Sequence, residues 1–165
     1  MFEPTSSDCY LMKSMSGIGF KTQLMLDHSG NYGNMLRDLN AFGGVKDSPL
    51  ISQADLPVAM KSFYGGEIFD DRSLLERWMK TLNKSSPSVT YFNTIALHDG
   101  NRLLSEDKIM PFHQAAKKLL DDVNYLFDAL ERSKRKTMIV FIGEHGRNYA
   151  GDAIQFSGLR DIPSP

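Results

Sequence analysis

Three acid–histidine pairs are the residues in this sequence whose types and spacing could carry out chemistry. Each pair lies within two residues of a following glycine. The pairs are Asp27-His28, His98-Asp99 and Glu144-His145. The chain has four histidines, and only His113 lies outside the pairs. Carboxylates and imidazoles bind divalent metal ions, and imidazole exchanges protons near neutral pH. The pattern therefore favours metal-assisted chemistry on an oxyanion, such as phosphoryl transfer.

The third pair follows a short apolar run, Met138 to Ile142, which is typical of a buried parallel strand. Chemistry in open α/β sheets sits just beyond the carboxyl ends of such strands. Two glycines, Gly143 and Gly146, bracket the pair and permit the turn that would let both of its side chains bind one metal ion. The alternative is a salt-bridged carboxylate beside a loop histidine.

The other two pairs also follow runs that predict strands, Phe20 to Leu26 and Val89 to Leu97. Hydrophobic periodicity predicts helices that begin near Asp8, cover 32–42, run from Asp70-Asp71 to about Asn83, and run from Pro111 to Ser133. In the third of these, Asp70-Asp71 can cap the start, and the stripe Leu74, Leu75, Trp78, Met79 and Leu82 would be its buried face. Residues 44–69 are expected to form a long irregular connection with a short strand near Val58 to Ser62. This alternation predicts an α/β fold with a mostly parallel sheet sandwiched by helices. Parallel strands would bring all three pairs to one rim of the sheet.

On that rim, His98 is the candidate general acid or base, and Arg160 is a candidate partner for phosphate oxygens. Arg160 could instead form a salt bridge with a neighbouring aspartate. His28 and Asp99 are candidates to support the metal ligands through hydrogen bonds. His28 could equally bond the backbone of its own loop, and Asp27 and Asp99 could order theirs.

Composition limits the function classes. The 165 residues suffice for one domain with a core, and the net charge of −1 gives no electrostatic case for nucleic-acid binding. No apolar run approaches the ~20 residues that cross a bilayer, and no signal peptide is visible. The lone cysteine, Cys9, excludes an internal disulfide. We interpret Cys9 either as a small buried hydrophobe or as one half of a pair completed elsewhere.

Several segments resemble the bacterial cellulose phosphoethanolamine transferase family, BcsG. The resemblance runs in the same order over essentially the whole chain. It is most specific in the last segment, with Glu144-His145 at the right distance before it. The segments are Leu24–Gly30, Leu56–Met60, His98–Asn101, Glu144–Gly146 and Gly158–Pro165.

The resemblance implies an alkaline-phosphatase-like fold and zinc as the cofactor. It makes residues 1–165 a partial catalytic domain, taken from the C-terminal part of that domain. By position in the family motifs, Glu144 and His145 match zinc ligands. His98 and Arg160 match active-site residues.

The resemblance also implies a reaction and a location. A serine or threonine nucleophile would take phosphoethanolamine from phosphatidylethanolamine and pass it to the glucose 6-hydroxyl of cellulose. The cellulose synthase machinery would be the partner. In the full-length family, transmembrane helices anchor the protein in the bacterial inner membrane and hold the catalytic domain in the periplasm.

Some parts of the family pattern have no counterpart here. The nucleophile and a further zinc ligand, a cysteine, would lie on sequence before this chain, and none of Ser6, Ser7 or Cys9 matches them. The disulfide partner that the resemblance implies for Cys9 would also lie there. Two smaller departures are Ala153, where the family often has arginine, and Gly143, where proline is common.

We therefore expect the chain alone to be catalytically inactive and to bind zinc weakly, because two protein ligands do not complete a zinc site. One alternative is another alkaline-phosphatase-like phosphatase or sulfatase. A second alternative, of a different class, is a truncated remnant that acts as a binding module without catalysis.

Overall fold

The computed structural model describes residues 10–42, 45, 48, 50–82, 86–106 and 108–143. Its helices are α1 (Leu11–Gly17), the 3-10 helix η2 (Tyr32–Asn34), α2 (Met35–Phe42), α3 (Asp71–Thr81) and α4 (Phe112–Ser133). Its strands are β1 (Lys21–Leu26), β2 (Val58–Lys61), β3 (Glu67–Phe69), β4 (Ser88–Asn93) and β5 (Arg102–Leu103). Three of the predicted site residues, Glu144, His145 and Arg160, lie outside the described residues.

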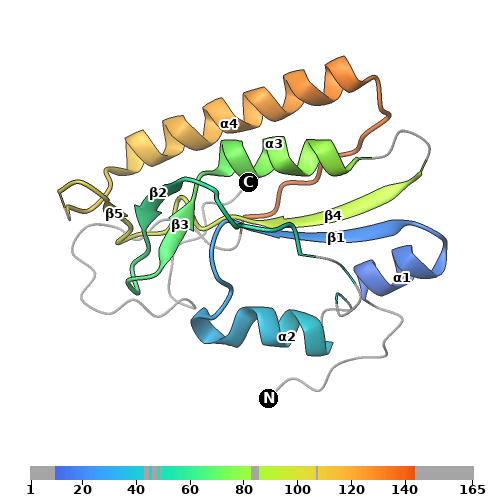
Figure 1. Cartoon of the computed structure of the whole chain (residues 1–165), viewed down its shortest axis with the longest axis horizontal. Coiled ribbons are helices and arrows are strands. Elements are labelled where there is room, and N and C mark those ends of the chain that lie inside the picture. The colour runs from blue at the N-terminus through green and yellow to red at the C-terminus, as the bar shows by residue number, and fades with distance from the viewer. Residues whose placement is uncertain are drawn as a thin grey trace.

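A parallel pair of strands, β1 and β4, forms the centre of the fold. Their register runs from Lys21 opposite Ser88 to Leu26 opposite Asn93. Helices α3 and α4 lie over one face of this pair, and α1 and α2 lie on the other side (Figure 1). The predicted α/β class, with helices on both sides of parallel strands, is confirmed.

Strand β1 explains why both helical layers are needed. Successive side chains of a strand point to opposite faces. Leu24 and Leu26 accordingly pack with Met12 of α1 and residues of α2, whereas Met25 packs with Leu74 and other residues of α3 and α4. All three of these side chains are almost fully buried, so the carboxyl half of β1 is apolar on both faces.

A second, antiparallel sheet has the strand order β3-β2-β5. The predicted short strand near Val58 to Ser62 is β2, and the prediction of an irregular connection around it was incomplete. Strand β3 pairs with β2 across a tight hairpin, and Met60 and Ile68 of the two strands bury a third small core with Ala96. The sequence did not predict β3 and β5 because these strands have only three and two residues, too few to show a periodic pattern.

The strand predicted over Met138 to Ile142 is not formed. These residues have no strand assignment, and Met138 and Ile142 are each 86% exposed. The run reads as a strand because of its composition, but a strand exists only where a neighbour supplies backbone hydrogen bonds and a covering layer. Among the described residues, no strand pairs with this run, and most of its side chains stay exposed.

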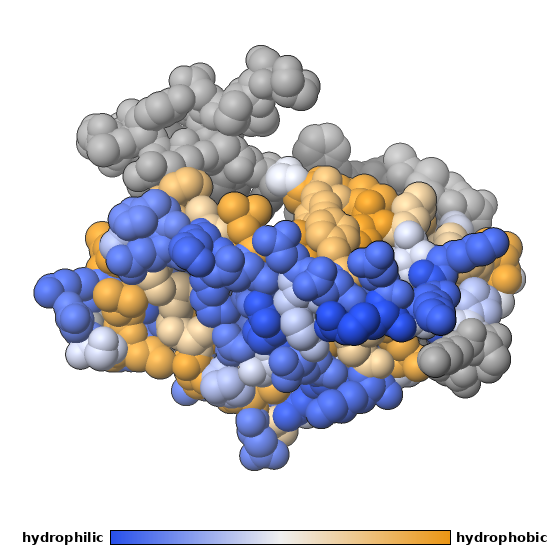
Figure 2. Space-filling model, turned by 90° about the horizontal axis from the view of Figure 1, so that it is seen from above, coloured by the Kyte–Doolittle hydropathy of each residue, from blue (hydrophilic) through white to orange (hydrophobic). Residues whose placement is uncertain are grey.

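The α4 side of the molecule is mostly hydrophilic, with hydrophobic residues gathered in patches (Figure 2). Exposed apolar residues of α4 itself include Leu120 and Phe127, and the Phe127 ring lies 6.3 Å from that of Phe141. No helix among the described residues is long and apolar enough to cross a bilayer.

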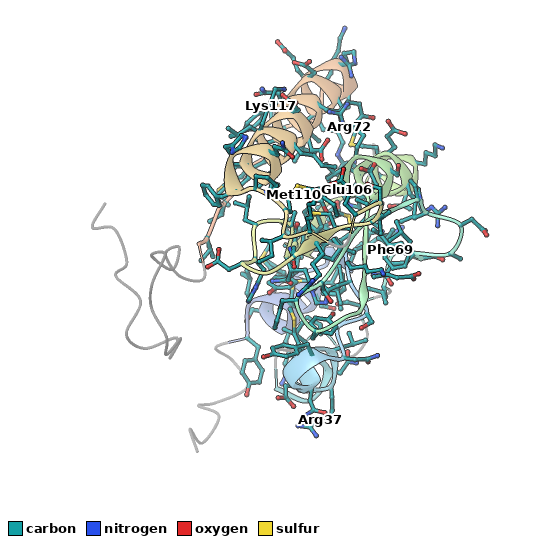
Figure 3. All side chains as sticks on the ribbon, turned by 90° about the vertical axis from the view of Figure 1, so that its left-hand side faces the viewer. Arg37, Phe69, Arg72, Glu106, Met110 and Lys117 are labelled. Carbon is teal, nitrogen blue, oxygen red and sulfur yellow. The ribbon has the colours of Figure 1, made fainter. Side chains whose placement is uncertain are left out.

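An ion-pair network joins α3 to α4. The Lys118 ammonium lies 2.8 Å from the Asp70 carboxylate and 2.7 Å from that of Asp122, and Arg72 donates to Asp122 at 3.0 Å. Figure 3 shows Arg72 and Lys117 in this upper helical layer and Arg37 at the opposite side, on α2. Asp70 also caps α3 as predicted, since its carboxylate accepts the Ser73 backbone N–H at 2.9 Å.

The turn after β1 depends on a glycine. Gly30 has a φ of +71°, and a Cβ atom added there would lie 2.8 Å from the Cβ of Leu36. We predict that Gly30→Ala lowers the free energy of unfolding by about 1–3 kcal/mol, because the new methyl group adds a steric clash to an unfavourable backbone conformation. Urea denaturation measures this loss. Gly17→Ala is the control, because nothing lies within 4 Å of the added atom. Equal stability of the two variants would contradict the prediction.

Candidate functional site at the strand ends

A buried carboxylate, that of Asp27, ties the ends of β1 and β4 together. Asp27 directly follows β1 and is fully buried. Its two oxygens accept the backbone N–H of Ile95 at 3.0 and 3.1 Å, and one also accepts the Thr94 hydroxyl at 2.9 Å. These bonds bend the chain away from the sheet directly after β4.

A second buried carboxylate, that of Asp71 at the start of α3, shares the Thr94 hydroxyl. Its Oδ2 lies 3.0 Å from Thr94 Oγ1, and its Oδ1 has no hydrogen-bond partner among the described residues. A hydroxyl donates only one proton. Since Asp27 has the backbone N–H of Ile95 as a second donor, we place the Thr94 proton on Asp27, with a protonated Asp71 donating to Thr94 Oγ1.

The ionisation of this pair follows from burial. Desolvation is the main cause that raises the pKa of Asp71, to about 7. Desolvation and the nearby Asp71 charge together raise the pKa of Asp27 well above its usual value. Two carboxylates that are close together and buried away from water do not both ionise readily. The pair therefore holds a proton near neutral pH.

His28 is buried and bonded at both ring nitrogens. Nδ1 accepts the backbone N–H of Gly30 at 3.0 Å, and Nε2 lies 2.8 Å from the side-chain oxygen of Asn93. Because an amide oxygen only accepts, Nε2 carries the ring proton. Desolvation by burial lowers the pKa of His28, which favours this neutral form. Its nearest Asp27 oxygen, 4.0 Å away, therefore faces an uncharged ring at neutral pH.

His98 lies in a turn, not directly at a strand end. The predicted strand Val89 to Leu97 was too long: β4 ends at Asn93, and the Asp27 carboxylate accepts the backbone N–H of Ile95 two residues later. The His98 ring stacks on Phe63 with centroids 3.9 Å apart and an interplanar angle of 12°. Its Nδ1 lies 2.8 Å from the Asp99 carbonyl oxygen, so in the neutral ring Nδ1 carries the proton and Nε2 the lone pair.

Asn101 fixes the turn that holds His98. Its buried side chain donates to the Ile95 carbonyl at 2.7 Å and accepts the Phe63 backbone N–H at 3.3 Å. The turn after β4 is thereby bonded to the β2–β3 hairpin that carries Phe63. His98 is held from both sides, by its own turn and by the hairpin.

The structure thus brings two of the three predicted pairs, Asp27-His28 and His98-Asp99, to the same end of the parallel strands. The third pair and Arg160 lie outside the described residues, so their convergence on this rim stays a prediction. Among the described residues, no three His, Cys, Asp or Glu side chains are placed to hold a metal ion.

Sequence reasoning missed several residues of the site. Thr94, Asn93 and Phe63 carry no motif, and Asp71 was considered only as part of a helix cap. Of the missed residues, only Asn101 could have been found from the sequence, because it belongs to the His98–Asn101 segment that carries the family resemblance.

A shallow groove of about 580 Å³ lies elsewhere, at the amino end of β4 and the carboxyl end of α4. It is lined by Ser86, Pro87 and the basic segment 132–136. It carries no acid–base pair and lies at the wrong end of β4 for the predicted chemistry. We therefore locate the candidate site by the strand ends and not by this groove.

Comparison with known proteins identifies relatives over the whole chain. A family model described as "Cellulose biosynthesis protein BcsG C-terminal domain" matches residues 1–165. The "Cellulose biosynthesis protein BcsG" of Escherichia coli K12 is 40% identical over 167 residues, and that of Salmonella typhimurium LT2 is also 40% identical over 167 residues. Each match covers 100% of this chain but 30% of the relative, so the chain spans under a third of their length.

The buried carboxyl pair predicts an unusual pH dependence of stability. The unfolded chain loses the Asp71 proton near the ordinary pKa of 3.8, but the folded chain keeps it to about pH 7. The free energy of unfolding should therefore fall between about pH 4 and 7, by at most about 1.4 kcal/mol per pH unit. Asp71→Asn, which stays neutral and can donate to Thr94, should remove this part of the fall. Thermal unfolding at pH 5 and pH 8 measures it.

The matched control for that experiment is Asp38→Asn, because the Asp38 side chain is 45% exposed and its ion pair among the described residues is with Arg37, at the surface. We expect Asp38→Asn to follow the pH dependence of the unmodified chain. Parallel pH profiles for Asp71→Asn and the unmodified chain would contradict a protonated Asp71.

Proposed function

Because the chain belongs to the family of the cellulose biosynthesis protein BcsG C-terminal domain, we propose that it acts in cellulose biosynthesis as part of a phosphoethanolamine transferase. The observation that carries the proposal is the match of the family over residues 1–165. The 40% identity to two proteins named for cellulose biosynthesis supports the same process.

The proposed reaction needs more than this chain. Phosphoethanolamine moves from phosphatidylethanolamine to a serine or threonine nucleophile and then to the glucose 6-hydroxyl of cellulose. The nucleophile would come from the part of the family protein that this chain does not span. The donor is a membrane lipid, which fits a catalytic domain in the periplasm, next to the inner membrane and the cellulose synthase machinery.

Zinc is the cofactor in this proposal, and Glu144 and His145 would hold it. One carboxylate and one imidazole are donors that zinc accepts, but they are too few, and the described residues supply no further set. The site would need a ligand from the remainder of the protein. When bound, the ion neutralises charge on phosphoryl oxygens and lowers the pKa of the nucleophile.

The hydrogen bond at His98 Nδ1 supports a role for this residue as general acid or base. The Asp99 carbonyl fixes the proton on Nδ1, which leaves Nε2 as the basic atom. Nε2 can take the proton from the attacking 6-hydroxyl, or, once protonated, give one to the leaving oxygen. Phe63 holds the ring plane while this happens. Arg160 would pair with phosphate oxygens through its guanidinium.

The proposal is tested by completing the protein. We suggest replacing the matching segment of the E. coli relative with this chain and expressing the chimera in a strain that lacks its own BcsG. Phosphorus NMR of the isolated cellulose should then show phosphoethanolamine. His98→Ala should reduce transfer at least about 100-fold, as should the double variant Glu144→Ala, His145→Ala.

The control is His113→Ala, because His113 is exposed on α4 and lies outside the three acid–histidine pairs. It should transfer normally. A folded, membrane-inserted chimera without any transfer would contradict the proposal and favour a non-catalytic binding module. Full activity in His98→Ala would refute the role of that histidine.

A further inference from the structure

Three aromatic rings form a continuous cluster beside His98, and we call Tyr32, Phe63 and Tyr64 the aromatic platform. Tyr32 stacks on Tyr64 with centroids 5.0 Å apart and an interplanar angle of 17°. Phe63 stands nearly perpendicular to both, at 4.7 Å from Tyr32 and 5.1 Å from Tyr64. Phe63 in turn stacks on His98. The platform therefore leads directly to the proposed acid–base residue.

Among the described residues, no aromatic ring covers the outer face of Tyr32. The three centroid distances are nearly equal, so Phe63 lies beside the Tyr32–Tyr64 stack and not across Tyr32 from Tyr64. Tyr64 thus covers one face of the Tyr32 ring, and Phe63 does not cover the other. In agreement, Tyr32 is 56% exposed, whereas Phe63 and Tyr64 are half-buried.

The fold holds the platform firmly. Ser62 and Gly66 close the β2–β3 hairpin with a 2.7 Å backbone bond, and Gly65 at φ +88° permits the turn that carries both hairpin rings. Tyr32 begins η2 and is followed by two residues in the left-handed conformation, Gly33 and Asn34. The rings come from two separate segments, and each segment has its own tight turn. A preformed aromatic surface loses little conformational entropy when it binds a ligand.

The chemistry of the platform selects its ligand. It carries no positive charge to pair with a phosphate, and its ring surface favours a ligand with a flat, apolar face. A β-linked glucose ring has such a face, because its hydroxyl groups lie around the ring edge and its C–H groups lie on the two faces. The hydroxyl of Tyr64, a platform residue, and that of Ser62, in the same hairpin, are buried without a partner among the described residues. Binding sites for small molecules pair apolar surface with a few such polar groups.

We propose that the aromatic platform is the acceptor subsite, on which a glucose ring of cellulose stacks against the outer face of Tyr32. This inference rests on the proposed function for the identity of the glucan. It adds the residues that would recognise it. A glucan on Tyr32 would lie next to Phe63, the ring that stacks on His98, so a neighbouring 6-hydroxyl would come near that histidine.

The test is a titration of the 165-residue chain with cellohexaose, followed by NMR, without zinc or lipid. We expect saturable binding with shifts of the Tyr32 and Phe63 ring signals. Tyr32→Ala should weaken binding about fivefold or more, because a stacked ring is lost. Tyr32→Phe should keep the binding, because the ring and not the hydroxyl carries the contact.

The matched control is Tyr91→Ala, which removes a partly exposed tyrosine of β4 that belongs to no aromatic pair of the platform. It should bind cellohexaose normally. No saturable binding, or equal binding by Tyr32→Ala, would overturn the subsite. Ring shifts with zwitterionic lipid vesicles but none with cellohexaose would also overturn it, in favour of a lipid contact.

The binding result is independent of the transfer reaction. The titration contains no donor and needs no zinc. Cellohexaose can therefore bind even if the chimera shows no phosphoethanolamine transfer, and the chimera can show transfer even if cellohexaose does not bind. A chimera that transfers normally with Tyr32→Ala at every cellulose concentration would count against the subsite alone. A higher KM for glucan at unchanged kcat would support it.

Discussion

The buried carboxylate of Asp27 is the interaction on which the described site depends. It follows the most buried strand, has no lysine or arginine partner among the described residues, and is held instead by the Ile95 backbone and the Thr94 hydroxyl. Burying a carboxylate without a cation costs several kcal/mol unless hydrogen bonds or a shared proton offset it. Asp71 supplies that proton through Thr94. The strand ends are therefore joined by a small network in which each member needs the others.

The position of His98 follows from the hydrogen bonds of Asp27. Because Asp27 takes the Ile95 N–H, β4 stops at Asn93 and the chain turns toward the β2–β3 hairpin. Asn101 and Phe63 then fix the turn and the histidine ring. The same hairpin carries the aromatic platform, so one arrangement sets both the proposed acid–base residue and the proposed glucan surface. A site on rigid neighbours keeps its geometry when a substrate arrives.

The sequence predicted what depends on local pattern. The stripe of Leu74, Leu75 and Trp78 indicated α3, Asp70 indicated its cap, and β1 was placed to within a residue with His28 just after it. It did not predict the Asp27–Thr94–Asp71 network, whose members are brought together only by the pairing of β1 with β4. The run Met138 to Ile142 shows the opposite error, because strand composition alone does not make a strand without a neighbour. The roles of Glu144, His145 and Arg160 rest on family motifs and stay predictions.

The central claim is that the hydrogen bonds of the turns after β1 and β4 hold His28 and His98 in fixed and opposite neutral tautomers. Long-range ¹H–¹⁵N correlation spectra of the imidazole rings in the intact chain, recorded at a pH where the rings are neutral, test it directly. We predict the Nε2–H tautomer for His28, since Nδ1 accepts from Gly30, and the Nδ1–H tautomer for His98, since Nδ1 donates to the Asp99 carbonyl. Exposed His113 serves as the internal reference. If His28 and His98 show the same tautomer, or the averaged signals of a freely turning ring, the described site geometry is contradicted.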